Sequence, residues 1–330
     1  MKKTLLLFLL IAIFVSCGNN DKKEASKPEV EDVGSKTFDL AYKFKTGDKF
    51  SYKMKTVSGQ GQEMKTDTTM RTELNQTVNY KFDFEVREVD ADKNTEFSVV
   101  LSDIDVDVVA NGKKHTFKGG KPVKVEDKKN FIEYEAMYNV PFGIRVNKIG
   151  EIIEVFKTAK IVDNIINLQG LKDSVKAEEK QQYIVNINET ALKPLLQQFF
   201  RRLPNKKIGK DSTWTFSYPS ALMVYKLNNT TTYTVRNFLK LDDELLANID
   251  LSLSTSYEGK NKVSERGVNY TFSEPKISGA GNILFNVDKG IMQKAETNTK
   301  LELKLLMEAT GMTATRKDFS GNTNYIELIK

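Results

Sequence analysis

Two residues of the chain carry the side chains that enzymes use most often for nucleophilic and acid–base chemistry. His115 is the only histidine and Cys17 is the only cysteine among the 330 residues. A histidine-based triad would have to use His115, but no Gly-x-Ser-x-Gly motif accompanies it, and a zinc site needs several histidine or cysteine ligands. His115 follows the turn-like stretch Asn111-Gly112-Lys113-Lys114. We therefore expect a surface histidine, with no catalytic residue, no metal and no cofactor.

Three aspartates are the next candidates for chemistry. Asp103, Asp105 and Asp107 alternate along a predicted strand, so they share one face, and carboxylate oxygens are ligands that calcium prefers. The spacing begins like a calcium-binding loop. Val108, however, stands where the sharp turn needs glycine, and Lys114 stands where the bidentate glutamate belongs. The pattern favours a solvent-facing strand over a calcium site.

The 44 acidic residues leave one enzymatic alternative open. Glycoside hydrolysis uses two carboxyl groups that face each other at a set distance, and a sequence alone cannot select such a pair. A hydrolase of envelope glycans or lipids that uses carboxylates therefore remains the alternative to a protein without catalytic function.

The first residues of the chain predict export. Lys2 and Lys3 precede an apolar run from Leu5 to Val15, which is too short to cross a hydrocarbon core of about 30 Å. The run ends in Phe14-Val15-Ser16-Cys17, which resembles the lipobox of bacterial lipoprotein signals, although Phe14 stands where leucine is usual. We predict a signal peptide at residues 1–16 and lipidation of Cys17. An ordinary signal peptide and an N-terminal anchor helix are the alternatives.

A single cysteine agrees with lipidation, because an exported chain with one cysteine cannot form an intramolecular disulfide. Palmitate-type acyl chains on Cys17 would hold the protein at a lipid membrane without spanning it. Residues 17–36 are polar and charged, so we expect a flexible tether. The formal net charge of +6 is spread along the chain without a nucleic-acid-binding motif, so we expect no nucleic acid partner.

Period-two alternation dominates the first unit of the body, residues 37–150. From Val78 to Val86, apolar and aromatic residues alternate with polar ones, which is typical of a half-buried antiparallel strand. Further runs of this kind are Tyr42 to Val57, Glu96 to Val109, Tyr233 to Leu241, Leu245 to Tyr257, Gly281 to Val287 and Glu296 to Leu306. The body is therefore predicted to be rich in β-strands.

A helical segment is predicted at residues 151–204. Apolar residues recur at helical spacing from Ile152 to Ile166, with Gly170 as a stop, and again from Leu192 to Leu203, with Pro204 as a terminator. The second helix, beginning near Thr190, carries Phe199-Phe200 followed by Arg201-Arg202. Such a stripe can bind a membrane or a lipid, but packing against a sheet requires the same pattern, and we favour packing.

The second β unit, residues 205–330, begins like the first. A glycine-led turn feeds an aromatic strand at Gly47-Asp48-Lys49-Phe50 and again at Gly209 to Phe216, so duplication of one β unit is an open alternative to chance similarity. Trp214, Phe216 and Tyr218 alternate on one strand face, where we expect core packing.

The lipobox Phe14-Val15-Ser16-Cys17, the polar tether and the two β-rich units together resemble uncharacterised exported lipoproteins of Bacteroidota-type bacteria. We expect an α+β fold of two curved antiparallel β units joined by a central helical segment. The expected function is that of a membrane-anchored lipoprotein of the cell envelope, with the periplasmic or surface face of the outer membrane favoured and the inner membrane left open. It would bind an apolar ligand or an envelope protein.

Overall fold

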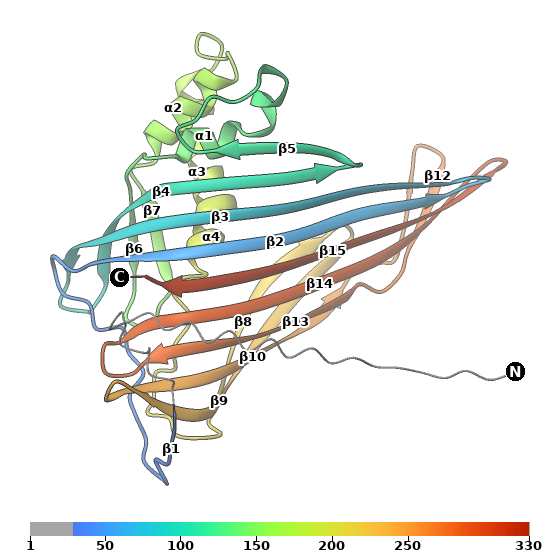
Figure 1. The fold of residues 1–330 in the computed structure, drawn as a ribbon. Coiled ribbons are helices and arrows are strands. Elements are labelled where there is room, and N and C mark those ends of the chain that lie inside the picture. The colour runs from blue at the N-terminus through green and yellow to red at the C-terminus, as the bar shows by residue number, and fades with distance from the viewer. Residues whose placement is uncertain (1–28, 330) are drawn as a thin grey trace, which may run out of the picture.

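The protein is described by a computed structural model over residues 29–329, so the predicted signal peptide and Cys17 lie outside the described residues. Within this range the strands form one antiparallel sheet of 15 strands (Figure 1). The strands are β1 (Glu29–Glu31), β2 (Lys49–Lys65), β3 (Thr69–Val89), β4 (Thr95–Ala110), β5 (Lys113–Lys118), β6 (Phe142–Val146), β7 (Ile152–Phe156), β8 (Thr213–Leu222), β9 (Tyr225–Leu241), β10 (Glu244–Glu258), β11 (Lys262–Glu265), β12 (Val268–Phe272), β13 (Lys276–Asn286), β14 (Ile291–Ala309) and β15 (Met312–Leu328).

The order of the strands largely follows hairpins along the chain, with a long-range pairing of β1 with β9 and a long-range closure between β15 and β2. The main path is β1-β9-β10-β13-β14-β15-β2-β3-β4-β6-β7, while β5 pairs with β4, β8 with β9, and β12 with both β11 and β14. The closure joins β15 to β2, with Leu328 opposite Tyr52 at one end and Thr315 opposite Lys65 at the other. The first and last long strands are therefore neighbours in the middle of the sheet.

The predicted α+β fold of two β units joined by a helical segment is wrong. The β15–β2 pair makes the two predicted units one continuous antiparallel sheet, and the helices are few and short. The β-rich character is confirmed, and β3 extends the alternation seen from Val78 to Val86 over Thr69–Val89. Its aromatic residues face those of β2, with Phe82 opposite Tyr52 and Phe84 opposite Phe50.

The helices differ from their predicted bounds. They are η1 (Val125–Asn130), α1 (Ile132–Met137), α2 (Ala159–Leu168), α3 (Ala177–Ile187), η2 (Asn188–Leu192) and α4 (Lys193–Leu196). Ile152 to Phe156 forms strand β7 instead of a helix, because β6 offers it a pairing edge. Gly170, with a φ of +73°, follows the end of α2 as predicted.

The second predicted helix, from Thr190 to Leu203, forms only as far as Leu196. The helical backbone arrives from α3, widens into the π-helical turn η2 and ends with α4 at Leu196. Pro194 has no N–H to donate to the carbonyl of Thr190, which disfavours a regular α-helix across this point. Residues 197–202 then form a loop that runs toward β8.

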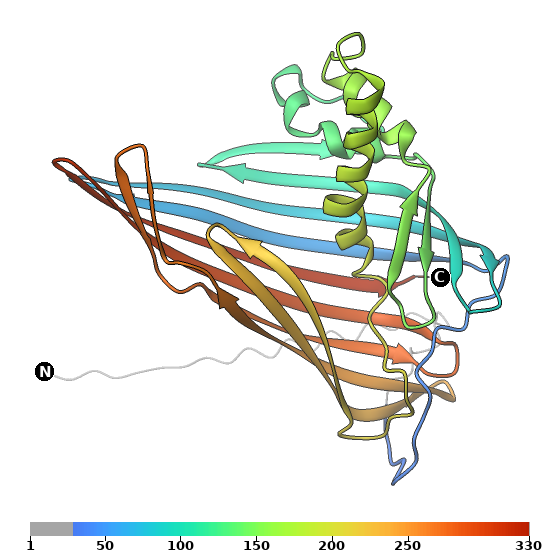
Figure 2. The same cartoon turned by 180° about the vertical axis from the view of Figure 1, so that it is seen from behind.

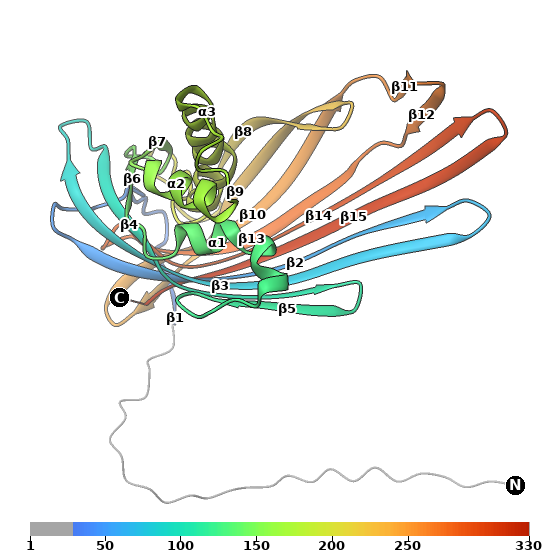
Figure 3. The same cartoon turned by 90° about the horizontal axis from the view of Figure 1, so that it is seen from above.

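The sheet bends into a curved surface whose concave side carries the helices. Figure 3 shows α1 to α3 inside the curve, at the end of the sheet where β6 and β7 lie. Seen from behind, α3 and the β8–β9 hairpin lie in front of the long strands (Figure 2). Among the described residues, no helix is long and apolar enough to cross a membrane.

Candidate ligand-binding site

The concave face is apolar beneath the helices. Tyr52, Phe82 and Phe84 on β2 and β3 are almost fully buried there. Phe199, from the loop after α4, covers them, with ring centroids 5.4, 5.1 and 5.5 Å away. Phe200 packs on Phe84 and on Phe97 of β4. We call this group, which belongs to the large core of the protein, the helix-end core.

A second apolar group lies on the same face, farther along the strands. This hairpin-end cluster consists of the buried residues Tyr225, Leu227, Phe272, Leu303 and Leu305, which come from β9, β12 and β14. It is separate from the helix-end core. The concave face therefore has two apolar regions with a stretch of different character between them.

The stretch between the two apolar groups is hollow, and we call it the trough. It holds a cavity of about 510 Å³ between the β8–β9 hairpin and the concave face of the sheet. The apolar residues that line it include Leu74, Leu222, Leu227, Leu253, Ile277 and Leu301. The uncharged polar residues include Ser58, Gln60, Asn229, Thr299, Ser320 and Asn322. Lys300 is the one charged residue among the described residues that line this cavity.

A second cavity of about 440 Å³ continues the trough toward the tips of the strands. It shares Gln60, Leu74, Leu222, Leu301 and Ser320 with the first cavity. Met223 at the tip of the β8–β9 hairpin and Asn111 at the β4–β5 turn also line it, so both turns border the same hollow.

The polar character of the trough comes from the residues on the concave face of the strands. Alternate residues of β2 point to the same face of the sheet. Along β2 the residues on the concave face are first Phe50, Tyr52 and Met54 and then Thr56, Ser58 and Gln60. Thr56 donates a hydrogen bond from Oγ1 to Oδ1 of Asn324 on β15 over 2.8 Å. The sheet thus replaces aromatic side chains with amides and hydroxyls where the helices no longer cover it.

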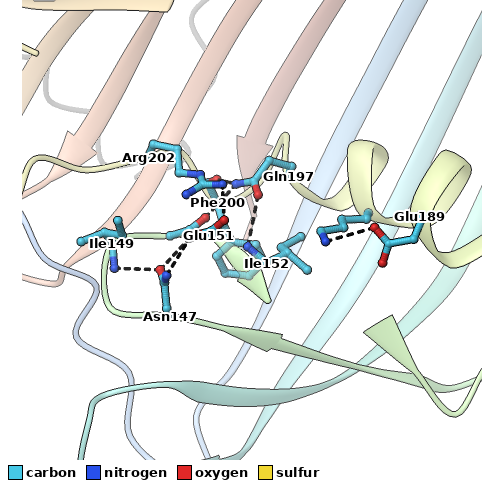
Figure 4. Close-up of polar contacts among 10 residues, drawn as sticks. Asn147, Ile149, Glu151, Ile152, Glu189, Gln197, Phe200 and Arg202 are labelled. Carbon is cyan, nitrogen blue, oxygen red and sulfur yellow. Dashed lines mark hydrogen bonds and ion pairs between the residues drawn. The ribbon is translucent and has the colours of Figure 1, made fainter. Parts of the chain in front are cut away.

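The loop after α4 is tied to the β6–β7 turn by a polar network (Figure 4). Gln197 donates from Nε2 to the carbonyl of Gly150 over 2.7 Å and accepts at Oε1 from the backbone N–H of Ile152 over 3.2 Å. Arg202 donates from Nη2 to Oε1 of Glu151 over 2.7 Å. This network fixes the position of Arg201, which lies between the tied residues.

Arg201 lines a third cavity, of about 360 Å³, together with Phe216, Tyr218 and Tyr233. Its Nη2 donates to Oε1 of Gln198 over 2.9 Å, but its Nε is buried without a hydrogen-bond partner among the described residues. Burial lowers the pKa of the Arg201 guanidinium from its usual value. Tyr218 lines both this cavity and the 510 Å³ cavity, so the two are adjacent.

Among the residues considered from the sequence, His115 lies away from the trough. It belongs to β5 and is only partly exposed, with Nδ1 2.6 Å from Oδ1 of the buried Asp127 in η1. Asp105 and Asp107 on β4 form ion pairs with Lys118 and Lys114 of the neighbouring strand, both at 3.1 Å. Residues 29–329 contain no group of three or more acidic, histidine or cysteine side chains arranged to hold a metal ion.

The aromatic residues of β8 divide between packing and the cavities. Trp214 stacks on Tyr233 with centroids 5.1 Å apart and donates from Nε1 to the carbonyl of Arg202 over 3.0 Å. Tyr218 is 47% exposed and faces the trough. The Leu192 to Leu203 stripe is buried in the helix-end core, so packing, the favoured interpretation, is confirmed.

A family model described as "Family of unknown function (DUF6263)" matches residues 92–292. No curated protein matches the sequence.

Solved structures give distant similarities only. A lipovitellin structure on lipid–protein interactions has 10% identity and a TM-score of 0.42, covering 87% of this chain and 26% of that chain. OccK2 of Pseudomonas aeruginosa has 6% identity and a TM-score of 0.22, and the match covers 86% of this chain and 100% of the OccK2 chain. A DUF1329 protein of Desulfovibrio piger has 7% identity and a TM-score of 0.14, covering 83% of each chain. The chain thus spans about a quarter of the lipovitellin chain, and TM-scores this low carry no argument about function.

Proposed function

The chain belongs to DUF6263, a family of unknown function, and from this premise we propose that it is a ligand-binding lipoprotein of the cell envelope. Its ligand is an apolar or amphiphilic molecule, and the binding site is the trough. The protein is anchored to the membrane through acylated Cys17 and acts without catalysis.

One observation carries this proposal: the concave face is left hollow between the helix-end core and the hairpin-end cluster. A cavity of about 510 Å³ lies within the range of roughly 300–1,000 Å³ that is usual for small-molecule sites. Sites of this kind are mostly apolar, with a few polar groups that orient the ligand. The trough combines both kinds of group, with a larger share of polar side chains.

The side chains around the trough suit a molecule with both apolar and polar parts. Leu227, Leu253 and Leu301 offer apolar surface that an acyl or similar chain would cover, which is favourable because it removes apolar area from water. Ser320 and Asn322 on β15 offer hydroxyl and amide groups on the same face. A ligand with a few hydrogen-bonding groups would satisfy both.

The hydrolase alternative needs a carboxyl group whose pKa is raised so that it can act as a general acid. Four carboxyl groups among the described residues have clearly shifted pKa values, namely Asp83, Asp90, Glu151 and Glu302, and each is lowered. None of them lines the trough cavity. We therefore favour binding over hydrolysis.

The anchoring part of the proposal rests on the sequence. The lipobox Phe14-Val15-Ser16-Cys17 supports acylation of Cys17, and acyl chains supply the hydrophobic signals that stable anchoring requires. We place the protein at the outer membrane, on its periplasmic or surface face, where the trough would meet envelope lipids or proteins.

A fluorescent apolar probe tests the binding site directly. The full-length protein, purified and held in amphipol, is titrated with N-phenyl-1-naphthylamine, whose emission rises in apolar surroundings, and amphipol alone provides the blank. Ser320→Trp fills the trough from an exposed position of β15 and should weaken binding about tenfold or more. Thr323→Trp adds the same side chain to the opposite face of the same strand and should bind like the unmodified protein.

Two results would contradict the proposed function. The first is an unmodified protein that gives no more emission than amphipol alone. The second is equal binding by the two tryptophan variants, which would place the probe elsewhere on the protein.

A further inference from the structure

Arg201 is a charged residue whose neighbours do not balance its charge. Among the described residues no carboxylate forms an ion pair with it, and the titratable side chains around it are the phenols of Tyr42, Tyr218 and Tyr233, which are neutral at pH 7. The adjacent Arg202, in contrast, has a carboxylate partner in Glu151. One arginine of the pair is therefore neutralised and the other is not.

Arg201 is partly buried, and a partly buried cation without a counter-ion is unfavourable because it has lost some of its hydration without gaining an opposite charge. Arginine also has five N–H donors in a fixed plane, which suits a carboxylate or phosphate. At Arg201, Nη2 is used by Gln198, while Nε is buried and has no partner among the described residues. The side chain is thus held in place through one hydrogen bond from Nη2, and its guanidinium has further N–H donors.

The cavity beside Arg201 has the lining that an anionic group needs. Tyr218, Thr231 and Tyr233 bring hydroxyl groups to the same cavity, and no acidic residue lines it in the described part of the chain. Tyr218 also lines the 510 Å³ cavity, so an anion at Arg201 can be continuous with an apolar chain in the trough.

We propose that Arg201 binds the anionic head group of an amphiphile whose apolar part lies in the trough. The head group is a carboxylate or a phosphate monoester, which share the oxygen acceptors that a guanidinium recognises. The inference rests on the proposed function of the trough and adds the charge and orientation of the ligand. The head lies next to the helix-end core and the chain points toward the hairpin-end cluster.

Displacement of N-phenyl-1-naphthylamine from the full-length protein in amphipol separates the two proposals. Decanoate, decyl phosphate and decanol have the same apolar chain and differ in the head group. The measured quantity is the ratio of the concentrations of decanol and of each anion that displace half of the probe. One charge-assisted hydrogen-bonded pair predicts a ratio of roughly ten or more for at least one anion.

Three variants assign the selectivity to the side chain. Arg201→Met keeps the unbranched stem of the side chain but removes the guanidinium and its charge, and the ratio should fall to about one. Arg201→Lys keeps the charge and should retain a ratio clearly above one. Arg266→Met removes the same charge from the exposed β11–β12 turn and should leave the ratio unchanged. Because the ratio compares ligands on one protein, partial loss of folded protein does not alter it.

The outcomes distinguish the two ideas. Absence of probe binding to the unmodified protein overturns the proposed function of the trough. Probe binding with equal displacement by the anions and decanol, or selectivity that survives in Arg201→Met, overturns the role of Arg201 alone. Stronger displacement by decanoate indicates a carboxylate ligand, and stronger displacement by decyl phosphate indicates a phosphate ligand.

Discussion

Arg202 and Glu151 are 51 residues apart in the sequence, yet Nη2 of the arginine lies 2.7 Å from Oε1 of the glutamate. The same guanidinium lies over the ring of Phe216, 4.0 Å from its centroid. The ion pair attaches the loop after α4 to the β6–β7 turn, and the ring contact attaches it to β8. The residue before Arg202 is therefore positioned from two directions.

Replacement of Glu151 by glutamine should make the stability of the protein fall less steeply as the pH is lowered into the acid range. The hydrogen bond from Arg202 holds the pKa of Glu151 below its ordinary value of about 4.3. A lowered pKa means that the folded state favours the carboxylate, so this stabilisation is present above the ordinary value and is lost as the pH falls through the folded value. The glutamate side chain is 41% exposed, so we expect the ion pair to contribute less than about 1 kcal/mol to the free energy of unfolding.

Thermal unfolding between pH 6 and pH 3 measures this effect. The melting temperature of the unmodified protein should fall more steeply than that of Glu151→Gln. Glu265→Gln, which alters an exposed glutamate at the β11–β12 turn, should follow the unmodified protein. If the melting temperature of Glu151→Gln falls with pH as steeply as that of the unmodified protein, the Glu151–Arg202 pair does not contribute to stability.

A methyl group at Gly150 should disturb the Arg201 segment. A Cβ built at this position would lie 2.3 Å from the carbonyl oxygen of Arg201, and the residue has a φ of +88°. Gly112, with a φ of +82°, has nothing within 4 Å of the same position. Gly112→Ala should therefore lower the free energy of unfolding by only about 1–2 kcal/mol, because the new side chain disfavours the left-handed backbone conformation. Gly150→Ala should lower it by about 1–3 kcal/mol more, because the methyl group also clashes with the Arg201 carbonyl.

Urea unfolding of the two alanine variants isolates the steric term as their difference. Gly150→Ala should also weaken anion selectivity in the displacement assay, since it shifts the backbone that carries Arg201. Equal stability of the two variants would mean that the turn and the loop can move apart freely.

The Tyr52 hydroxyl should contribute to stability out of proportion to its size. The side chain is almost fully buried, and the hydroxyl donates to the carbonyl of Met292 over 2.6 Å. Tyr52→Phe leaves that buried carbonyl without this donor, which should lower the free energy of unfolding by about 1–3 kcal/mol. Tyr325→Phe, at a ring that is 44% exposed, should change it by less than about 0.5 kcal/mol. Urea unfolding of both variants provides the comparison, and equal losses would argue against the buried bond.

Replacement of Cys17 by alanine should release the protein from the membrane or misdirect it. Acylation needs the thiol, and without acyl chains the anchoring signals are absent. Cell fractionation and labelling with an alkyne analogue of palmitate measure the two effects, and Ser26→Ala in the predicted tether is the control. A variant that stays in the membrane fraction and keeps the label would contradict the lipoprotein assignment.

Alternation along the chain predicted many of the strands because each has one apolar face. It did not identify β15, in which Ser320, Asn322 and Asn324 occupy the concave face in place of apolar residues. Ser320 and Asn322 line the trough, and Asn324 accepts the hydrogen bond from Thr56, so none of the three belongs to an apolar core. The polar residues that line the proposed binding site therefore removed the apolar alternation by which β15 could have been recognised in the sequence.

The order of the strands and the site at Arg201 depend on contacts between distant parts of the chain. The sequence pattern shows which face of a strand is buried but not which strand lies beside it, so two separate β units remained plausible. Arg201 and Arg202 looked alike as a basic pair. Only the folded chain shows that Glu151 reaches Arg202 and that no carboxylate among the described residues is paired with Arg201.

The pairing of β2 with β15 has a consequence for biosynthesis. A chain synthesised from its N-terminus exposes β2 long before β15, so one edge of β2 stays open until nearly the whole polypeptide has been made. Exposed strand edges are templates for pairing with other chains, and closures over such long sequence separations are slow. Newly made molecules would therefore be open to pairing with other chains during this interval, and truncations that remove the last strand would be prone to aggregate.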